Sequence, residues 1–328
     1  MRPTAATATL GGARWATWAW TVVPAIAVLE LVLHLVQIRS VTTDENWGEA
    51  RAAVKAIVQP DDLVVFAPSW TDPVGRMSFG DEIATLEREA RADESRFPRA
   101  IEVSIRGKHA PELEGWRKST ERAVGRITIS TFDNPSYSKT IDDLVTRVAR
   151  PAGKSSVEVT IAEAGNDRGQ ETERIERPCS LVREGVQTGN LGFGPAIPAD
   201  KFRCGGSIVG ATVVADLDYH ARRCIYATPP GGSSALRIKF KDIAFGKVLH
   251  GHHGLYAEAE RHRDGAPVYL TFFAGDDRIG KVVHVDGEGW KGFELVTHDL
   301  DGKRGDLVAE VSAPNANRRM YCFEAITR

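Results

Sequence analysis

The sequence lacks the signatures of most hydrolases and of nucleic-acid-binding proteins. Its 42 Lys and Arg residues are balanced by 44 Asp and Glu residues, so no basic excess exists to attract a phosphate backbone, and we expect no nucleic-acid partner. No H-E-x-x-H or C-x-x-C motif is present, and Ser207 lies in GGSIVG rather than in the G-x-S-x-G motif of a nucleophile elbow. The sequence therefore predicts no cofactor and favours a protein that is not an enzyme.

Cysteine is scarce, and all four cysteines lie in the C-terminal half of the chain. An even number is compatible with two disulfides in an oxidising compartment, and four cysteines allow three pairings. If Cys224 and Cys322 lie on the first and last strands of one sandwich, they could join its ends, and Cys179 would then pair with Cys204. Four buried thiols are the alternative, because free cysteine also behaves as a small hydrophobic residue.

Only one long apolar run is present, and it extends from Trp15 to Ile38. About 24 residues of helix are enough to cross the roughly 30 Å hydrocarbon core of a membrane. Trp18 and Trp20 lie near its start, where amphipathic rings prefer the membrane interface. Because no A-x-A-like cleavage site follows the run, residues 1–40 are predicted to be a retained signal anchor rather than a cleaved signal peptide.

Charges around this run predict its orientation. Arg2 and Arg14 precede the run and Arg39 follows it, a small excess that favours a single-pass cell-membrane protein whose soluble domains are extracytoplasmic. Glu30 and His34 are four residues apart and share one face of the helix. Either this face contacts a polytopic membrane partner, such as a glycosyltransferase, or both side chains reach the nearby interface.

Residues 41–135 alternate between helical and strand patterns. Three segments have the length and pattern of strands, at residues 62–67, 100–105 and 126–131, and the first of them is an uninterrupted apolar run. Three helical patterns precede them, at residues 42–58, 81–93 and 112–124. Buried strands separated by amphipathic helices are typical of a parallel sheet covered on both faces. We therefore predict a small Rossmann-like α/β domain.

After residue 135 the helical periodicity ends. Residues 136–205 are predicted to be a β-rich connecting region. From residue 206 to residue 328, strand-like runs alternate regularly with breaks such as PPGG, AGDD and APNAN, which favours an antiparallel β-sandwich of the jelly-roll type. The predicted fold class is thus α/β plus all-β, with one transmembrane helix before the two domains.

A group of histidines in KVLHGHHGLY is the first candidate site. His250 and His252 have the two-residue offset that places both on one face of a strand, where they could chelate a metal if a third ligand approaches. Glu258, His284 and His298 are candidates for that ligand. The spacing departs from the cupin motifs, and alternation with glycine is also typical of a strand edge. The pattern favours β-structure over a metal site.

The loop FAPSWTDPVGRMSFGD is the second candidate site. It follows the first predicted strand, where open α/β sheets bind ligands. It carries four side chains that could contact a ligand by stacking or by charge: Trp70, Asp72, Arg76 and Asp81. Its glycines do not form G-x-G-x-x-G or a Walker loop, so no phosphate site is indicated. In the structural alternative, Asp81 caps a helix, Arg76 pairs with a carboxylate and Trp70 fills the domain contact.

The third candidate site lies in the predicted sandwich. Its candidate ligand-binding residues are Tyr256, Asp286, Trp290 and Arg318. Aromatic rings beside carboxylate and guanidinium groups can bind a sugar by stacking and by hydrogen bonds to its hydroxyls. The alternative is that Trp290 packs in the core or at its rim.

Two parts of the chain resemble known families. Residues 47–132, through VQPDDLVVFAPSW, resemble the extracytoplasmic α/β region of membrane glycosyltransferases of the dolichyl-phosphate-mannose mannosyltransferase type. Those transferases carry many spans and an acidic catalytic loop that this sequence lacks, so the resemblance implies the fold and not the activity. Residues 222–328, with GKVLHGHHGL and RRMYCFEAITR, are similar to galactose-binding-like jelly rolls, which bind glycans in many settings and are structural in others.

These observations predict a membrane-anchored, extracytoplasmic and non-catalytic module that binds glycans, or assists assembly, in cell-envelope polysaccharide metabolism. The alternatives are an enzyme that acts on glycans, either through the loop around Asp72 or through a metal on His250 and His252, and a structural subunit that steadies a polytopic transferase.

Overall fold

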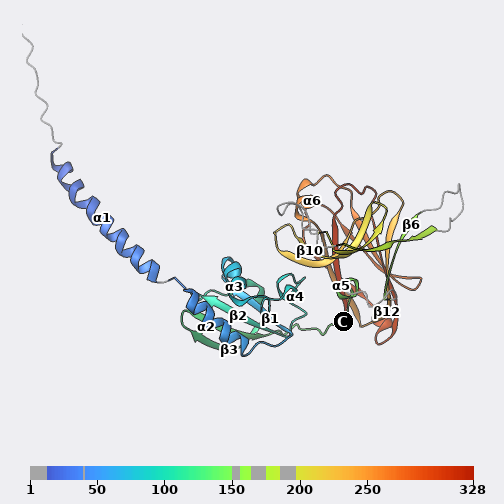
Figure 1. The fold of residues 1–328 in the computed structure, drawn as a ribbon, viewed down its shortest axis with the longest axis horizontal. Coiled ribbons are helices and arrows are strands. Elements are labelled where there is room, and N and C mark those ends of the chain that lie inside the picture. Colours follow the sequence, from blue (N-terminus) through green and yellow to red (C-terminus); the bar gives the residue numbers. More distant parts are fainter. Residues whose placement is uncertain (1–12, 40, 150–155, 164–174, 185–196) are drawn as a thin grey trace, which may run out of the picture.

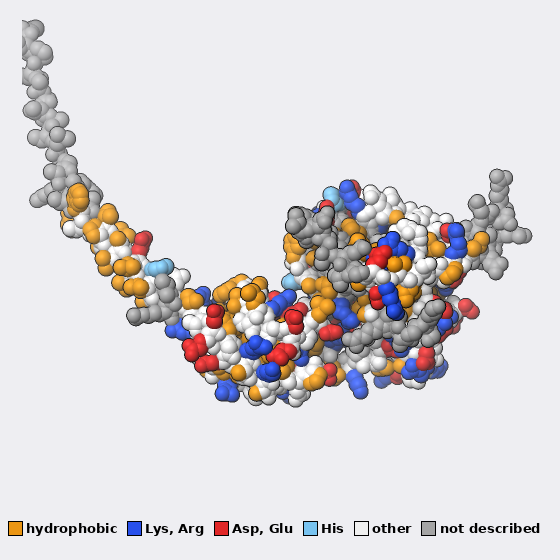
Figure 2. All heavy atoms as spheres, viewed as in Figure 1, with side chains coloured by type: hydrophobic (Ala, Val, Ile, Leu, Met, Phe, Trp, Pro, Cys, Tyr) orange, Lys and Arg blue, Asp and Glu red, His pale blue; other side chains and the backbone are white. Residues whose placement is uncertain are grey.

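The computed structural model describes residues 13–39, 41–149, 156–163, 175–184 and 197–328. Its first element, the helix α1 (Ala13–Arg39), extends away from the folded domains, and exposed hydrophobic side chains are frequent on it between Trp18 and Val36 (Figures 1 and 2). The 18-residue stretch Trp20–Gln37 has a mean hydropathy of 1.7, and none of it is buried. This apolar helix, a signal or an anchor, and the two disulfides described below indicate an extracytoplasmic location. Arg2 lies outside the described residues.

The first domain is a small mixed α/β sheet with its helices. In chain order its elements are α2 (Asp44–Lys55), β1 (Asp62–Ala67), η1 (Ser69–Thr71), α3 (Asp72–Phe79), α4 (Leu86–Glu89), β2 (Arg99–Ile105), η2 (Pro111–Leu113), β3 (Arg117–Val124) and β4 (Ile127–Asp133). The strand order is β1-β2-β4-β3. Only β1 and β2 are parallel, and the other pairs are antiparallel.

Strand β1 is buried on both faces, as its continuous apolar sequence predicts. Val64 and Phe66 face one hydrophobic cluster, and Leu63 and Val65 face another. Helix α3 packs closely on the end of this strand, because a Cβ atom at Gly75 would lie only 2.3 Å from the Phe66 ring. This close contact holds the first turn of α3 at the carboxyl end of β1.

Two of the predicted helices are wrong in this domain. The segment 112–124 forms η2 and the strand β3, which pairs with β4 through a tight turn at Gly125, where φ is +57°. The segment 81–93 is α-helical only over Leu86–Glu89. The sheet is therefore mixed rather than parallel throughout, although the α/β domain itself is confirmed.

The rest of the described chain forms two antiparallel sheets that pack face to face (Figure 1). One sheet has the order β16-β13-β18-β11-β10-β9-β8 with β5 on β18, and the other has the order β15-β14-β17-β12-β6-β7. The first sheet contains β5 (Asp142–Asp143), β8 (Ser180–Arg183), β9 (Asp200–Cys204), β10 (Ser207–Ala215), β11 (Ala221–Ala227), β13 (Val248–Leu255), β16 (Lys291–Val296) and β18 (Tyr321–Thr327). The second contains β6 (Val157–Glu163), β7 (Ile175–Pro178), β12 (Ala235–Ala244), β14 (Val268–Ala274), β15 (Asp277–His284) and β17 (Arg304–Ser312).

The core of the sandwich consists of the inward side chains of both sheets, among them Leu236, Phe240, Phe272 and Phe323. Short helices lie at its ends: α5 (Leu144–Ala149), α6 (Ala257–His262) and η5 (His298–Leu300). The predicted antiparallel β-sandwich is thus confirmed. Strands β6 to β9, which lie in the segment 136–205, pair with β12 and β10 and belong to the same two sheets.

Two disulfides join strands of the sandwich, and both were predicted. Cys224 on β11 pairs with Cys322 on β18, and Cys179 pairs with Cys204 on β9. The alternative of four free thiols is therefore excluded. The first bridge closes a separation of 98 residues and the second a separation of 25 residues.

The two domains meet along the segment Ala90–Arg96, which follows α4. The backbone N–H of Arg223 donates to the Ala90 oxygen at 2.7 Å, and the Arg222 guanidinium donates to the Arg91 oxygen at 2.9 Å. The Trp290 indole N–H donates to the Ala92 oxygen at 3.2 Å. These donors lie on or beside strands of the sandwich, so the backbone oxygens of the segment take part in the contact, together with side-chain contacts such as Arg96 with Asp143 at 3.0 Å.

Candidate functional site

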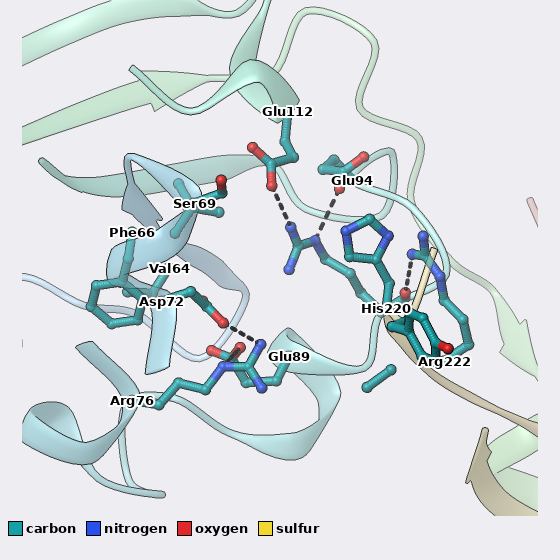
Figure 3. A pocket seen from close by; sticks show the side chains of 14 residues that line it. Val64, Phe66, Ser69, Asp72, Arg76, Glu89, Glu94, Glu112, His220 and Arg222 are labelled. Atoms are coloured by element: carbon teal, nitrogen blue, oxygen red, sulfur yellow. Dashed lines mark hydrogen bonds and ion pairs between the residues drawn. The ribbon is translucent and has the colours of Figure 1, made fainter. Parts of the chain in front are cut away.

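A cavity of about 360 Å³ lies between the two domains (Figure 3). The α/β domain lines it with the end of β1, the start of α3 and the segment Ala90–Arg96, and the sandwich lines it with the turn from Tyr219 to Arg222 between β10 and β11. Crevices outside the carboxyl ends of parallel strands and contacts between domains are where ligands most often bind. Both descriptions apply to this cavity.

Three ionisable side chains form a row along its floor. The Arg76 guanidinium lies 2.7 Å from an Asp72 oxygen and 2.6 Å from the Glu89 Oε2 atom. Asp72 begins α3 and Arg76 follows one turn later, so both side chains project from the same helix face. The two acids therefore share one cation.

Glu89 is the member of this row whose pKa is shifted. Its side chain is only 9% exposed, and its Oε1 atom has no hydrogen-bond partner among the described residues. Burial raises the pKa of Glu89 to about 7, which the positive charge of Arg76 only partly opposes. A carboxyl group that titrates near neutral pH beside a cavity is typical of functional sites.

A second row of charges lies across the cavity from the first. The Arg91 side chain lies 3.0 Å from Glu94 and 3.8 Å from Glu112. From the sandwich, the Arg222 guanidinium lies 2.8 Å from Asp216. The cavity wall thus offers both hydrogen-bond donors and acceptors, fixed in place by ion pairs.

Tyr219 adds an exposed aromatic ring to the lining. Its side chain is 63% exposed, and its backbone has a φ of +62° in the turn between β10 and β11. The Arg261 guanidinium lies 4.4 Å from the centre of the ring. An apolar ring face beside charged hydrogen-bonding groups can accommodate a polyhydroxylated ligand.

The loop prediction is partly matched by this cavity. Asp72 and Arg76 line the cavity. Trp70 does not line it: its side chain is 60% exposed, and the Arg106 guanidinium lies 5.7 Å from the centre of its ring. Asp81 is exposed in the turn after α3, and the N-cap of α4 is Thr85 rather than Asp81. Sequence reasoning missed Glu89 and Tyr219, because neither belongs to a motif.

The predicted histidine pair lies at the same domain contact. His250 and His252 project from one face of β13 toward Asp93 of the α/β domain. The candidate third ligands are elsewhere: Glu258 and His298 are exposed, and His284 is buried against Glu260 at 2.6 Å. The residue that completes the group is thus an aspartate that the sequence analysis did not consider.

The residues of the third candidate site do not line one common cavity. The buried Asp286 is paired with Arg319, and Trp290 contributes to the domain contact through Ala92. Tyr256 precedes α6 and packs near the Cys224–Cys322 bridge. Arg318 lines a separate hollow of about 760 Å³ at the end of the sandwich, of which the other three are not part. Their role in sugar binding stays a prediction.

Comparisons with known proteins show distant likenesses in structure only. The sequence matches no family profile and no curated protein. The chain is similar to the xylan-binding module CBM15, with a TM-score of 0.22 and 7% identity over 45% of this chain and 97% of that module. It is similar to CBM51-2 in complex with GlcNAc and INT domains from Clostridium perfringens ZmpB, with a TM-score of 0.27 and 10% identity over 64% of this chain and 45% of that one.

A third likeness is to the glycoside hydrolase domain of Endo-D from Streptococcus pneumoniae R6, with a TM-score of 0.24 and 14% identity over 36% of this chain. The chain spans about a fifth of that protein and under half of the CBM51-2 structure. At TM-scores this low the likenesses carry no argument about function. The resemblance of residues 47–132 to transferase domains also stays a prediction.

Proposed function

We propose that this chain is a membrane-anchored, extracytoplasmic protein that binds a saccharide in the cavity between its two domains. The helix α1 is the anchor, and the small excess of arginines before it leaves the folded domains outside the membrane. An anchored binding site of this kind would act as an accessory module in cell-envelope polysaccharide metabolism.

The observation that carries the proposal is the unpartnered Glu89 Oε1 atom beside the cavity. A buried carboxylate oxygen without a hydrogen bond is unfavourable by about 1 to 3 kcal/mol, and a ligand hydroxyl would supply the missing donor. The ring of Tyr219 supports the same ligand class, because sugar rings present C–H faces beside their hydroxyls.

Binding rather than catalysis is favoured by the way the acids are held. Asp72 and Glu89 both contact Arg76, which fixes both carboxylates in place although one cation balances only one of the two charges. Fixed acceptors of this kind hold hydroxyl groups well, and the guanidinium beside each carboxylate opposes its action as a nucleophile.

A second candidate function, hydrolysis of a glycan, is favoured by one observation. The pKa of Glu89, at about 7, is that of a carboxyl group able to donate a proton near neutral pH. Release of reducing sugar from a bound oligosaccharide, abolished by Glu89→Gln, would favour this function over binding alone.

The test is saccharide binding by the full-length chain in a mild non-ionic detergent. A glycan array selects the ligand, and titration calorimetry then compares the wild type with Tyr219→Ala and Glu89→Gln. We expect each variant to weaken binding about tenfold, equivalent to about 1.4 kcal/mol.

The matched control is Tyr137→Ala, which removes another exposed tyrosine that does not line the cavity and should leave binding unchanged. The proposal is wrong if no saccharide binds at millimolar concentration, or if the two cavity variants bind as tightly as the wild type.

A further inference from the structure

We propose that Asp93, His250 and His252 bind one divalent transition-metal ion across the contact between the two domains. One potential ligand atom from each residue lies within 4.8 Å of the other two. The Asp93 Oδ2 atom is 2.9 Å from Nε2 of His250 and 3.7 Å from Nε2 of His252. Ligand atoms bonded to one zinc ion at about 2.0 to 2.2 Å lie at comparable separations from each other.

The fold directs these three side chains toward one point. His250 and His252 alternate with Gly251 on β13, so both point to the same side of the sheet. Asp93 reaches them from the segment Ala90–Arg96, and the Ser95 backbone N–H donates to its Oδ1 atom at 3.1 Å. The Ser95 hydroxyl lies 2.9 Å from Oδ1 and 3.0 Å from Oδ2, the oxygen that faces the histidines, so the carboxylate is held in place before any ion binds.

The outer nitrogen of His252 faces a carboxylate. Its Nδ1 atom is 2.8 Å from Glu324, whereas Nδ1 of His250 is 3.7 Å from Glu294, which is beyond hydrogen-bond distance. The Trp290 indole stacks on the His252 ring with an angle of 7° between the planes. A carboxylate behind a metal-binding histidine fixes the ring and its tautomer, as Glu324 would do for His252, and this pattern recurs in protein metal sites.

Arg328 decides how the proton moves when the ion binds. Its guanidinium donates to Nδ1 of His250 at 2.9 Å, so without metal the proton of a neutral His250 lies on Nε2 and points to Asp93. With the ion on Nε2, a neutral imidazole would carry its proton on Nδ1, and two N–H donors cannot stay in contact. The Arg328 guanidinium would then turn away from Nδ1 and keep its contacts with Ser95 at 3.0 Å and with Glu294 at 3.3 Å.

The donor set selects the class of ion. Two imidazoles and one carboxylate suit zinc and the neighbouring first-row metals better than calcium or magnesium, which prefer oxygen ligands. The three side chains are 13% to 25% exposed, so water can reach a fourth coordination position. An ion held there joins β13 to the segment Ala90–Arg96 and stabilises the contact between the domains.

The test is zinc retention by the full-length chain, produced without a histidine tag, stripped with a chelator and mixed with equimolar zinc chloride. After gel filtration in detergent, elemental analysis should find one zinc per chain in the wild type. Asp93→Asn and His250→Ala should lose it, whereas His262→Ala, an exposed histidine on α6, should retain it. Near-ultraviolet circular dichroism of the zinc-free variants checks that they are folded.

A second variant, Glu324→Gln, tests the site if a ligand variant does not fold. Glutamine has the same size as glutamate, so we expect this variant to fold. Removing the carboxylate behind His252 should raise the zinc dissociation constant about 10- to 100-fold. The proposal is overturned if the wild type retains no stoichiometric zinc, if Asp93→Asn retains as much as the wild type, or if Glu324→Gln binds zinc with unchanged affinity. These outcomes are independent of saccharide binding in the cavity.

Discussion

Replacing Glu89 with glutamine should flatten the pH dependence of the stability of the α/β domain. In the folded protein, burial raises the pKa of Glu89 from its ordinary value of 4.5 to about 7. A carboxyl group whose pKa is higher in the folded state than in the unfolded state binds its proton more tightly when folded. Its stabilising contribution is therefore complete below about pH 4.5 and is lost as the pH rises through about 7.

The expected magnitude follows from that difference in pKa. About 1.4 kcal/mol for each pH unit between 4.5 and about 7 gives a loss of about 3 kcal/mol for the wild type. No discount for solvent is needed, since the side chain is only 9% exposed. Glutamine has nearly the same shape and does not titrate, so Glu89→Gln should not show this loss.

The assay is urea denaturation of the full-length chain in non-ionic detergent, from about pH 4.5 to about pH 8, followed by tryptophan fluorescence. Trp47, buried in the core of the α/β domain, reports its unfolding. Glu87→Gln, an exposed neighbour on α4, is the control and should keep the wild-type profile. Parallel profiles for the wild type and Glu89→Gln would refute the burial argument.

Four further predictions concern stability, the domain contact and the anchor. Removing the Cys224–Cys322 bridge should lower the free energy of unfolding by about 5 kcal/mol, and removing Cys179–Cys204 by about 3.5 kcal/mol, because the chain separations are 98 and 25 residues; denaturation of the paired alanine variants measures both. Arg88→Ala should destabilise the α/β domain by about 3 kcal/mol in the same assay, because it leaves the backbone oxygens of the buried residues Asp62 and Ile83 without their donor. Trp290→Phe removes the hydrogen bond to Ala92 and shortens the ring that stacks on His252, and it should weaken the domain contact by about 1 kcal/mol or more, seen as faster limited proteolysis of the segment Ala90–Arg96. Deleting residues 13–39 should move the protein from the membrane pellet to the soluble fraction after sedimentation.

The parts of the fold that were predictable are those whose sequence signal is local. Strand β1 is an almost continuous apolar run, and β2 and β4 are rich in isoleucine and other apolar residues, which favours burial wherever such segments lie. The sandwich strands are separated by turns rich in glycine and aspartate, and these turns mark in the sequence where one strand ends and the next begins. The disulfide pairing is correct although its premise is not, since β11 and β18 are neighbouring strands of one sheet rather than the first and last strands of the sandwich.

Strand β3 was missed because it is an exposed edge strand. Its residues Arg117–Val124 are mostly charged and polar, and such residues satisfy a helical pattern as well as a solvated strand. Pairing with β4 decides the outcome: the Ser119 and Thr120 hydroxyls both lie within 2.8 Å of the Thr131 hydroxyl across the sheet. Tertiary contacts of this kind override local helix propensity.

Each candidate site was predicted only in part, Asp72 and Arg76 in one and His250 and His252 in the other, because each is completed by the segment Ala90–Arg96. Arg91 and Glu94 from this segment line the cavity, and Asp93 between them faces His250 and His252. These partners are more than a hundred residues apart in the chain, so no local motif can contain them. Because the segment is fixed in part by hydrogen bonds to its backbone oxygens from Arg222, Arg223 and Trp290, its side chains remain available for ligands. The geometry of both sites therefore depends on the same docking of the sandwich against the α/β domain.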